Sequence, residues 1–387
     1  MKRSIVLLWA VSALLVSCGT RDGSSAIPVE DAQSKHFLDE YTGGRTYLMF
    51  DDKLLEADVN GIEDVRIDDG KVFVMYRPAS NDFIFDVIDE LSVFDMNGRF
   101  LNKIGHRGRG RNEYQSIKSW CIDAQKKQVI LVDGDNTIKR YAYDGTYISS
   151  TSFEDLVPLS GVMICNGKSY ANMLVPNHVA DDIIELKEDG TYVPLMDGRE
   201  IMQDMGPFEG SLSGIGPTKQ LFDPGLESFY HLRVYDDVLY RINDGQVQPC
   251  GRFDFIKRVE EDEEEFYFSR ELLYSRPLVS VETTDKFVIK FREVNSDNMV
   301  SGYVHYVYDK STQKCKRYKS GYDRNVGTII NNFDIVGITG DIIITRATPE
   351  GARYILENAA DKVPQSVLEK LKVLAERENE ALIFHRP

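Results

Sequence analysis

The feature that most constrains this fold is a turn pair, flanked by alternating apolar residues, that recurs along most of the chain. The pairs stand at Asn97-Gly98, Asp144-Gly145, Asp189-Gly190, Asp244-Gly245, Asp309-Lys310 and Glu350-Gly351, at spacings of 47, 45, 55, 65 and 41 residues. Such pairs favour β-hairpins, and a period of this length is typical of stacked repeats. The sequence therefore predicts an all-β fold, a six-bladed β-propeller of four-stranded antiparallel blades.

The clearest repeat runs from Ile104 to Ile148, where a glycine-rich lead precedes four expected strands. With this repeat as template, the other blades are expected at Ile62–Ile104, from Leu159, from Phe229, at Leu278–Lys319 and at Asn332–Glu357. Each blade packs only against its neighbours, so the roughly 350 residues of 37–387 can form one domain.

The last segment departs from the repeat. Apolar residues fall at helical spacing over residues 364–378, which predicts a short C-terminal helix. Ala381 to His385 then read as a short strand that adds to a blade and helps to close the ring.

Residues 1–17 resemble a bacterial lipoprotein signal peptide. Lys2 and Arg3 precede an apolar run that is too short to span a bilayer, and the run ends in Leu-Val-Ser before Cys18. The resemblance implies lipidation of Cys18 and an outer-membrane lipoprotein on the periplasmic or cell-surface side. An ordinary secretory signal is the alternative. Residues 18–36 are mostly small and polar, which predicts a flexible tether.

Composition narrows the classes of partner. The net charge is −16 and the sequence pI is about 4.9, so we expect no nucleic acid partner and no electrostatic adhesion to anionic lipid. The remaining cysteines lie far apart, without the spacing of a zinc or redox site. We expect small buried apolar side chains there, although the even count leaves disulfides open; the residues are Cys121, Cys165, Cys250 and Cys315.

The stretch from Ile104 to Ile148 resembles the NHL repeat. It has a glycine-rich lead ending in Glu113-Tyr114, two strands that end in Asp, an Asn136-Thr137-Ile138-Lys139 turn and the Asp144-Gly145 hairpin. Arg111-Asn112 replaces the usual Pro-Gly, so the lead loop is expected to differ. Over nearly its whole length the chain is similar to the six-bladed propeller lipoproteins of Bacteroidetes. That group is largely without assigned activity and is often associated with nutrient uptake or surface sensing.

Polar side chains on the inner strands are the first candidates for ligand binding, since inner strands line the channel of a propeller. Trp120 is suited to stacking on a sugar or peptide, and packing between blades is the alternative. By rough alignment the candidates are Glu63, Asp64, Arg66, Lys118, Trp120, His231, Arg233 and Arg276.

Two loops offer further candidates. The lead loop carries Arg107, Arg109 and Arg111 among glycines, a pattern suited to a carboxylate, sulfate or phosphate. A plain connection with solvated arginines is the alternative. Asp133-Gly134-Asp135-Asn136 resembles part of a calcium loop but lacks its downstream Gly and Glu, which favours a simple turn. No other cofactor is expected.

The six histidines are scattered, and neither HExxH nor GxSxG occurs. The first hypothesis is therefore a non-enzymatic module that binds a glycan, a peptide or a membrane-associated partner protein. The alternative is a channel-centred, metal-dependent hydrolase or lyase that acts on an extracytoplasmic polymer.

Overall fold

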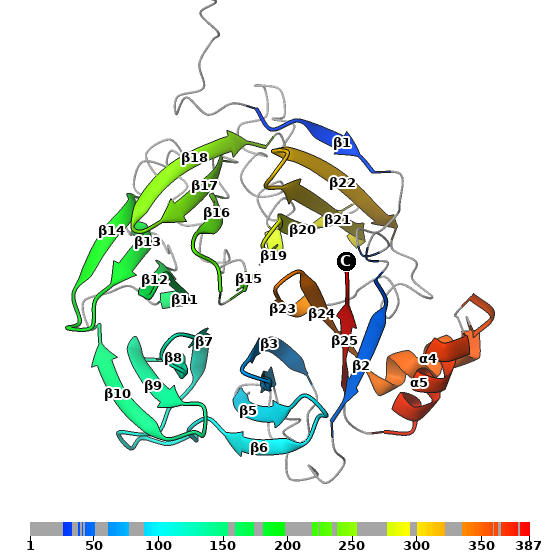
Figure 1. Ribbon diagram of the computed structural model, residues 1–387, viewed down its shortest axis with the longest axis horizontal. Helices are drawn as coiled ribbons and strands as arrows, with labels where there is room; N and C mark the ends of the chain where they lie inside the picture. Colours follow the sequence, from blue (N-terminus) through cyan, green and yellow to red (C-terminus); the bar gives the residue numbers. More distant parts are fainter. Residues whose placement is uncertain are drawn as a thin grey trace, which may run out of the picture.

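The protein is mostly β-strand, arranged in several small sheets around a common centre (Figure 1). This confirms the all-β class. The computed structural model describes residues 26–32, 38, 41, 43–50, 61–76, 89–153, 159–173, 181–197, 219–223, 225–233, 238–253, 277–294, 300–321, 335–358, 360–362, 365–377 and 380–387.

The first three groups of four strands match the predicted ones closely. Their strands are antiparallel and run outward from the centre in sequence order. The first group is β3 (Ile62–Asp68), β4 (Lys71–Tyr76), β5 (Glu90–Asp95) and β6 (Phe100–Lys103). The second is β7 (Ile117–Asp123), β8 (Gln128–Asp133), β9 (Thr137–Ala142) and β10 (Tyr147–Ser152). The third is β11 (Leu159–Cys165), β12 (Lys168–Met173), β13 (Asp181–Leu186) and β14 (Tyr192–Asp197).

Burial along the strands explains their sequences. The inner strand β8 is buried at nearly every position, because neighbouring sheets cover both of its faces, and its sequence is the continuous apolar run QVILVD. The outer strand β10 alternates between exposed and half-buried positions, and its sequence is the polar YISSTS. Apolar strands therefore lie inward and polar strands outward.

The fourth and fifth groups differ from the prediction at the centre. The fourth holds β16 (Phe229–Arg233), β17 (Val238–Asn243) and β18 (Gln246–Arg252), and the fifth holds β19 (Pro277–Glu282), β20 (Lys286–Val294), β21 (Val300–Asp309) and β22 (Lys314–Gly321). A further strand, β15 (Lys219–Phe222), pairs in parallel with β19 on its inner side. The prediction that the fourth repeat begins at Phe229 with an innermost strand is thus wrong, because β15 lies at the centre and β16 lies outside it (Figure 1).

The two ends of the chain meet in one sheet and close the ring. The order β2-β25-β24-β23 joins β2 (Arg45–Met49), β25 (Ala381–His385), β24 (Ile342–Ala347) and β23 (Ile335–Thr339). The predicted C-terminal strand is confirmed as β25, whereas β2 was not predicted. Strand β23 then pairs in parallel with β3 of the first group. A Cβ on Gly337 would lie 2.4 Å from the Val65 carbonyl oxygen, so glycine permits this close approach.

The predicted turn at Glu350-Gly351 and the predicted strand at Ala352–Glu357 are both wrong. These residues lie in helix α4 (Pro349–Asn358). Thr348 caps it, since its Oγ1 accepts the Gly351 N–H at 3.0 Å, and Pro349 stands at the first position, where proline is tolerated. The predicted C-terminal helix is confirmed as α5 (Gln365–Ala375), which packs on α4; the short helix η5 (Ala360–Lys362) lies between them.

The other five predicted hairpin turns are confirmed. Four of them place their glycine at positive φ, which glycine adopts without strain. Asp144 and Asp189 also accept the N–H two residues ahead at 2.9 Å, and Asp309 accepts the N–H groups of Ser311 and Thr312.

The segment expected to be a flexible tether is partly ordered against the rim. Strand β1 (Val29–Asp31) pairs in parallel with the outer strand β22, and Arg317 binds Asp31 through two bonds of 2.6 and 2.9 Å. Ile27 is buried among residues of the fourth and fifth groups. Further along, Leu38 and Tyr41 are buried against the fifth group and against strands β23 and β24 of the sheet that closes the ring. We call residues 26–32 the N-terminal strap.

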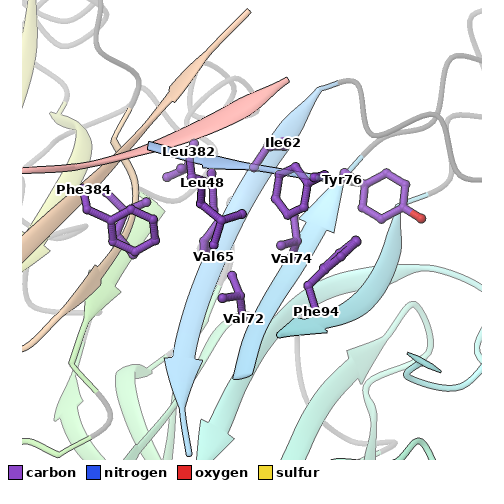
Figure 2. Close-up of a cluster of buried hydrophobic side chains, with 12 residues drawn as sticks. Leu48, Ile62, Val65, Val72, Val74, Tyr76, Phe94, Leu382 and Phe384 are labelled. Carbon is purple, nitrogen blue, oxygen red and sulfur yellow. The ribbon is translucent and has the colours of Figure 1, made fainter. Parts of the chain in front are cut away.

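Separate apolar clusters fill the spaces between neighbouring sheets. Figure 2 shows one of them, in which Leu48 of β2 and Leu382 and Phe384 of β25 face Val65 and Val74 of the first group. The burial of such surface is the main favourable term in folding, so contacts between residues from both ends of the chain hold the ring closed.

Strand direction separates two faces of the ring. The innermost strands β3, β7, β11, β15, β19 and β23 begin on one face, which we call the upper face. The short turns after β3, β11 and β23 and the confirmed hairpin turns lie on the opposite, lower face. Strands β4, β18 and β24 end on the upper face.

The four cysteines beyond Cys18 are free thiols. Cys121, Cys165 and Cys315 are buried in strands and Cys250 is half-buried, which agrees with their interpretation as small apolar side chains. Among the described residues, no helix is long and apolar enough to cross a membrane.

Candidate functional site

A buried ion pair lies at the centre of the ring. Nη1 of Arg66 stands 2.8 Å from Oδ1 of Asp64, and both residues belong to the innermost strand β3. Arg66 is 2% exposed and Asp64 is 6% exposed. A charge this deeply buried requires a partner, and Asp64 supplies it.

Two aromatic rings flank the same guanidinium. The Arg66 Cζ lies 5.6 Å from the ring centre of Trp120 on β7 and 5.7 Å from that of Phe222 on β15. Both distances allow cation–π attraction, which is stronger when the cation is shielded from water. We call Asp64, Arg66, Trp120 and Phe222 the central cluster. It joins three innermost strands, β3, β7 and β15.

One polar atom of the central cluster has no partner. Nε1 of Trp120 is buried, and no hydrogen-bond acceptor among the described residues lies within reach of it. Trp120 itself is 2% exposed. Its packing contacts are with residues of the first and second groups, including Phe73 and Leu131, so the tryptophan packs between sheets.

A chain of polar side chains lies near the inner end of the fourth group. Nδ2 of Asn172 donates to Oε1 of Gln220 at 2.9 Å, and Nε2 of Gln220 lies 3.3 Å from Nδ1 of His231. These residues come from β12, β15 and β16. His231 therefore reaches the centre through Gln220, although it does not lie on an innermost strand.

The other predicted channel residues are spread over the upper half of the ring or fall outside the described part. Glu63 is half-buried at the start of β3, and Lys118 is exposed near the start of β7. Arg233 ends β16. Arg276 and Cys18 lie outside the described residues. Of the eight inner-strand candidates, the structure brings Asp64, Arg66 and Trp120 together.

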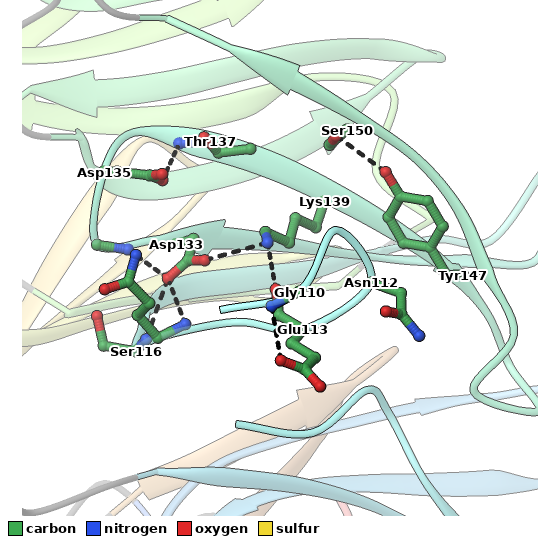
Figure 3. Close-up of polar contacts among 12 residues, drawn as sticks. Gly110, Asn112, Glu113, Ser116, Asp133, Asp135, Thr137, Lys139, Tyr147 and Ser150 are labelled. Atoms are coloured by element: carbon green, nitrogen blue, oxygen red, sulfur yellow. Dashed lines mark hydrogen bonds and ion pairs between the residues drawn. The ribbon is translucent and has the colours of Figure 1, made fainter. Parts of the chain in front are cut away.

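The arginine-bearing loop connects β6 to β7 on the upper face and is fastened by Glu113 (Figure 3). Oε2 of Glu113 accepts the Gly110 N–H at 2.6 Å, and Oε1 lies 3.0 Å from Nε2 of His106. The pKa of the Glu113 carboxyl lies below its usual range. The main cause is the hydrogen bond from the Gly110 N–H, and the second is the hydrogen bond with His106. The Gly110 N–H is thus bound by the chain's own carboxylate, which leaves the arginines as the groups that can meet an external anion.

Behind this loop lies a second anchored carboxylate. Oδ1 of Asp133 accepts the N–H groups of Gln115, Ser116 and Gly134 at 2.7 to 3.0 Å, and Oδ2 lies 3.4 Å from Nζ of Lys139 (Figure 3). Lys139 also donates to the Glu113 carbonyl. Asp133, the first residue of the suggested calcium loop, is therefore bound to protein groups.

The remaining residues of that loop form a turn between β8 and β9, as the alternative interpretation predicted. Asp135 accepts the Thr137 N–H at 3.0 Å, and Asn136 adopts a φ of 60°. The described residues contain no group of three His, Cys, Asp or Glu side chains placed to hold a metal ion.

A third buried carboxylate lies on the lower face, between the fourth and fifth groups. Glu282 accepts the Tyr230 N–H at 2.7 Å and pairs with Nζ of Lys310 at 2.8 Å. Burial raises the pKa of Glu282 to about 7, against the lowering effect of Lys310. Lys310 also stands 5.0 Å from the Tyr230 ring centre.

Sequence reasoning missed Phe222 and Gln220, both of which contact the predicted residues. They lie on the four-residue strand β15, which is too short to show a clear alternation. The signal that was present is the Asp244-Gly245 pair. In the first three groups this turn joins the third and fourth strands, so counting back from it makes β16 a second strand and requires another strand before it.

Comparison with known proteins gives a family match and several structural likenesses. The family model described as "Domain of unknown function (DUF4934)" matches residues 59–386. No curated protein matches the sequence. A putative exported protein from Bacteroides fragilis has a similar structure, with a TM-score of 0.65 at 15% identity over 92% of this chain and 98% of that one. This likeness shows a shared fold.

Two weaker likenesses carry no argument about this chain. An auxiliary nutrient binding protein from Bacteroides ovatus gives a TM-score of 0.34 at 11% identity, over 65% of this chain and 56% of that one. A GH74 xyloglucanase from Xanthomonas campestris gives 0.41 at 7% identity, over 74% of this chain and 44% of that one.

Proposed function

This chain belongs to the DUF4934 family, and we propose that it is an exported, lipid-anchored, six-bladed β-propeller that binds a glycan, peptide or partner protein on its upper face. The signal-like residues 1–17 support export and lipidation at Cys18. The description of the similar Bacteroides fragilis protein as exported agrees with this.

The innermost strands support the six-bladed arrangement. β3, β7, β11, β15, β19 and β23 each start one four-stranded unit when β15 is counted with β16, β17 and β18. The NHL-like character rests on the second unit, where Glu113 fastens the glycine-rich lead and Asp144-Gly145 forms the outer hairpin. Strand β1 is then an addition to the rim of the fifth unit.

The observation that carries the choice of face is the pair of polar side chains at the start of the innermost strands, Glu63 on β3 and Lys118 on β7. Arg66, Trp120 and Phe222 occupy the middle of the ring and are almost inaccessible to water. The cluster limits access to the centre from either side. We therefore assign the ligand to the surface above the cluster, where Glu63 and Lys118 stand.

A binding screen tests this proposal. The chain from Gly19 onward, which retains the N-terminal strap, is passed over arrays of glycans and peptides. Any ligand found is then measured against the upper-face variant Glu63→Gln/Lys118→Gln and the lower-face variant Lys126→Gln/Glu188→Gln, each of which removes one charge of each sign. We expect weaker binding only for the upper-face variant. Loss confined to the lower-face variant would refute the assignment.

The same screen separates binding from catalysis. Each ligand is incubated with the protein and its products are analysed, with and without a metal chelator. We expect every ligand to be recovered intact. Chelator-sensitive cleavage would instead support the channel-centred hydrolase or lyase.

Lipid anchoring has its own test. Cys18→Ala is expected to abolish incorporation of labelled fatty acid and to release the protein from the membrane fraction, because the acyl chains supply the anchoring. Protease treatment of intact cells then distinguishes the cell-surface side from the periplasmic side. Membrane retention of the unlabelled Cys18→Ala protein would contradict the anchor.

A further inference from the structure

We propose that the upper-face loop Gly105–Glu113 is a binding site for an acidic polysaccharide, whose carboxylate or sulfate groups pair with Arg107, Arg109 and Arg111. This inference rests on the proposed function, since it names the ligand class and the part of the upper face that contacts it. It also revises the site, because the guanidinium groups, and not the backbone N–H groups, face the ligand.

The three arginines are exposed, and none of them forms an ion pair within the described part of the chain. The segment Lys103–Lys118 carries five Lys and Arg side chains and a single acidic one, in a protein of net charge −16. That acidic residue, Glu113, is bound to Gly110 and His106 of the same loop. The loop therefore presents a local excess of positive charge on an acidic molecule.

The arginines stand on a firmly held backbone. The Gly108 N–H donates to the Tyr114 carbonyl at 2.9 Å, and the Tyr114 N–H donates to the His106 carbonyl at 3.1 Å. From the next strands, the Tyr141 hydroxyl donates to the Asn112 carbonyl at 3.2 Å. A loop that is ordered before binding loses less conformational entropy when a ligand arrives.

Two glycines of the loop lie against the Glu113 carboxylate. A Cβ on Gly108 would lie 1.8 Å from Oε2 of Glu113, and one on Gly110 would lie 3.0 Å from the same atom. A larger residue at either position would therefore displace the Glu113 side chain from its bonds to Gly110 and His106.

The exposure of the arginines favours a polymer over a small anion. An ion pair in water is individually weak, so one free sulfate or carboxylate would be held poorly at any of the three positions. A chain with repeated acidic groups engages several arginines at once, and each added contact is then intramolecular. Arginine suits such groups because its planar guanidinium binds carboxylate and sulfate oxygens in pairs.

The surroundings of the loop favour a polysaccharide over a protein or a nucleic acid. Protein interfaces are centred on large apolar side chains, but the exposed large apolar residues of the described part all lie outside residues 104–118. Binding of a single-stranded nucleic acid uses exposed aromatic rings for base stacking, whereas Tyr114 of this loop is 3% exposed.

The test measures binding of the purified full-length chain to polygalacturonate and to dextran sulfate, with neutral dextran as reference. We expect both polyanions to bind, more weakly as salt is raised, and dextran not to bind. Arg107→Gln/Arg109→Gln/Arg111→Gln should weaken binding at least tenfold. The charge-matched control Lys314→Gln/Lys370→Gln/Lys372→Gln changes exposed residues elsewhere and should stay within about twofold of the unaltered protein.

A second variant tests the role of the guanidinium. Replacement of the three arginines by lysine keeps the charge and removes the planar fork, so we expect an intermediate loss. Thermal unfolding of each variant confirms that the fold is intact. Unchanged binding by the triple glutamine variant, or an equal loss in the control, would overturn the inference.

The outcomes also separate this inference from the proposed function. If the unaltered protein binds no polyanion, and a neutral glycan or peptide binds the triple glutamine variant as well as the unaltered protein, then the arginine site is refuted. The upper-face proposal still stands in that case. Arginine-dependent binding of an acidic protein or an oligonucleotide, without binding of either polysaccharide, refutes the ligand class. Loss of all binding on the upper face refutes both proposals.

Discussion

The guanidinium of Arg66 lies 5.6 Å from the ring centre of Trp120, so a cation from one innermost strand faces an aromatic ring from the next. Phe222 approaches the same guanidinium from a third strand, and Asp64 balances its charge. Each of these groups limits the position of the others. The centre of the ring is therefore held by contacts between strands, in addition to hydrogen bonds within them.

We expect Arg66→Met to lower the free energy of unfolding by about 3 to 5 kcal/mol, because it removes the buried partner of Asp64. Urea unfolding followed by tryptophan fluorescence measures the loss. The double variant Asp64→Asn/Arg66→Met should recover part of it, since the buried negative charge is then gone. An unfolding midpoint of Arg66→Met equal to that of the unaltered protein would show that the ion pair contributes nothing to stability.

Gly337→Ala is expected to destabilise the ring closure by about 1 to 3 kcal/mol, because its Cβ would meet the Val65 carbonyl oxygen at 2.4 Å. Gly161→Ala is the matched control on another innermost strand, where the nearest atom would be 3.7 Å away. Thermal unfolding of both variants checks this. Equal melting temperatures for the two would mean that β23 and β3 can separate without cost.

Ile27→Ala is expected to cost about 2 to 5 kcal/mol if the N-terminal strap belongs to the folded unit, because Ile27 is 7% exposed among residues of two sheets. Ile148→Ala removes the same atoms from a side chain that is 45% exposed and should change stability by less than about 0.5 kcal/mol. Chemical unfolding compares them. Similar small effects would show that the strap detaches before the ring unfolds.

The Glu282 carboxyl should make the protein less stable as pH rises. Its pKa is raised from 4.5 to about 7 in the folded protein, so folding favours its protonated form. The stabilising contribution is full below about pH 4.5 and is lost as pH rises through 7, with a magnitude on the order of 3 kcal/mol. Unfolding measured from pH 4.5 to pH 8 should show this fall.

Glu282→Gln is the control for that pH dependence. The amide oxygen still accepts the Tyr230 N–H, and Lys310 keeps its bond to the Thr283 carbonyl at 2.6 Å. We therefore expect a flatter stability profile between pH 4.5 and pH 8, with the two proteins most alike at the acidic end, where Glu282 is uncharged, and with the unaltered protein losing stability relative to Glu282→Gln as pH rises. An unchanged slope in Glu282→Gln would assign the pH dependence to other groups.

Local patterns predicted the parts of the fold that depend on local physics. The continuous apolar run of β8, the alternation in β10 and the Asp-Gly turns each specify a strand or hairpin without reference to distant residues. Contacts over long distances in sequence were not predictable in this way. Strand β2 is fixed by β25 at the opposite end of the chain, and nothing near Arg45–Met49 indicates that partner.

Helix α4 shows how one residue can mislead. Gly351 after Glu350 is typical of a turn, but Thr348, Pro349 and the apolar residues Ala352, Ile355 and Leu356 are typical of a helix start and an apolar helical face. The candidate site was affected similarly. Arg66 and Trp120 were found from their strands, whereas Phe222 could not be, because its short strand was not predicted.

The closure of the ring by β2 and β25 also sets an order of events during synthesis. The residues of β2 emerge from the ribosome among the first, and their antiparallel partner Ala381–His385 emerges among the last. Because β2 cannot complete its sheet until the whole chain is present, a nascent chain remains an open row of sheets with an unpaired edge. The ring can therefore close only after Ala381–His385 have been synthesised.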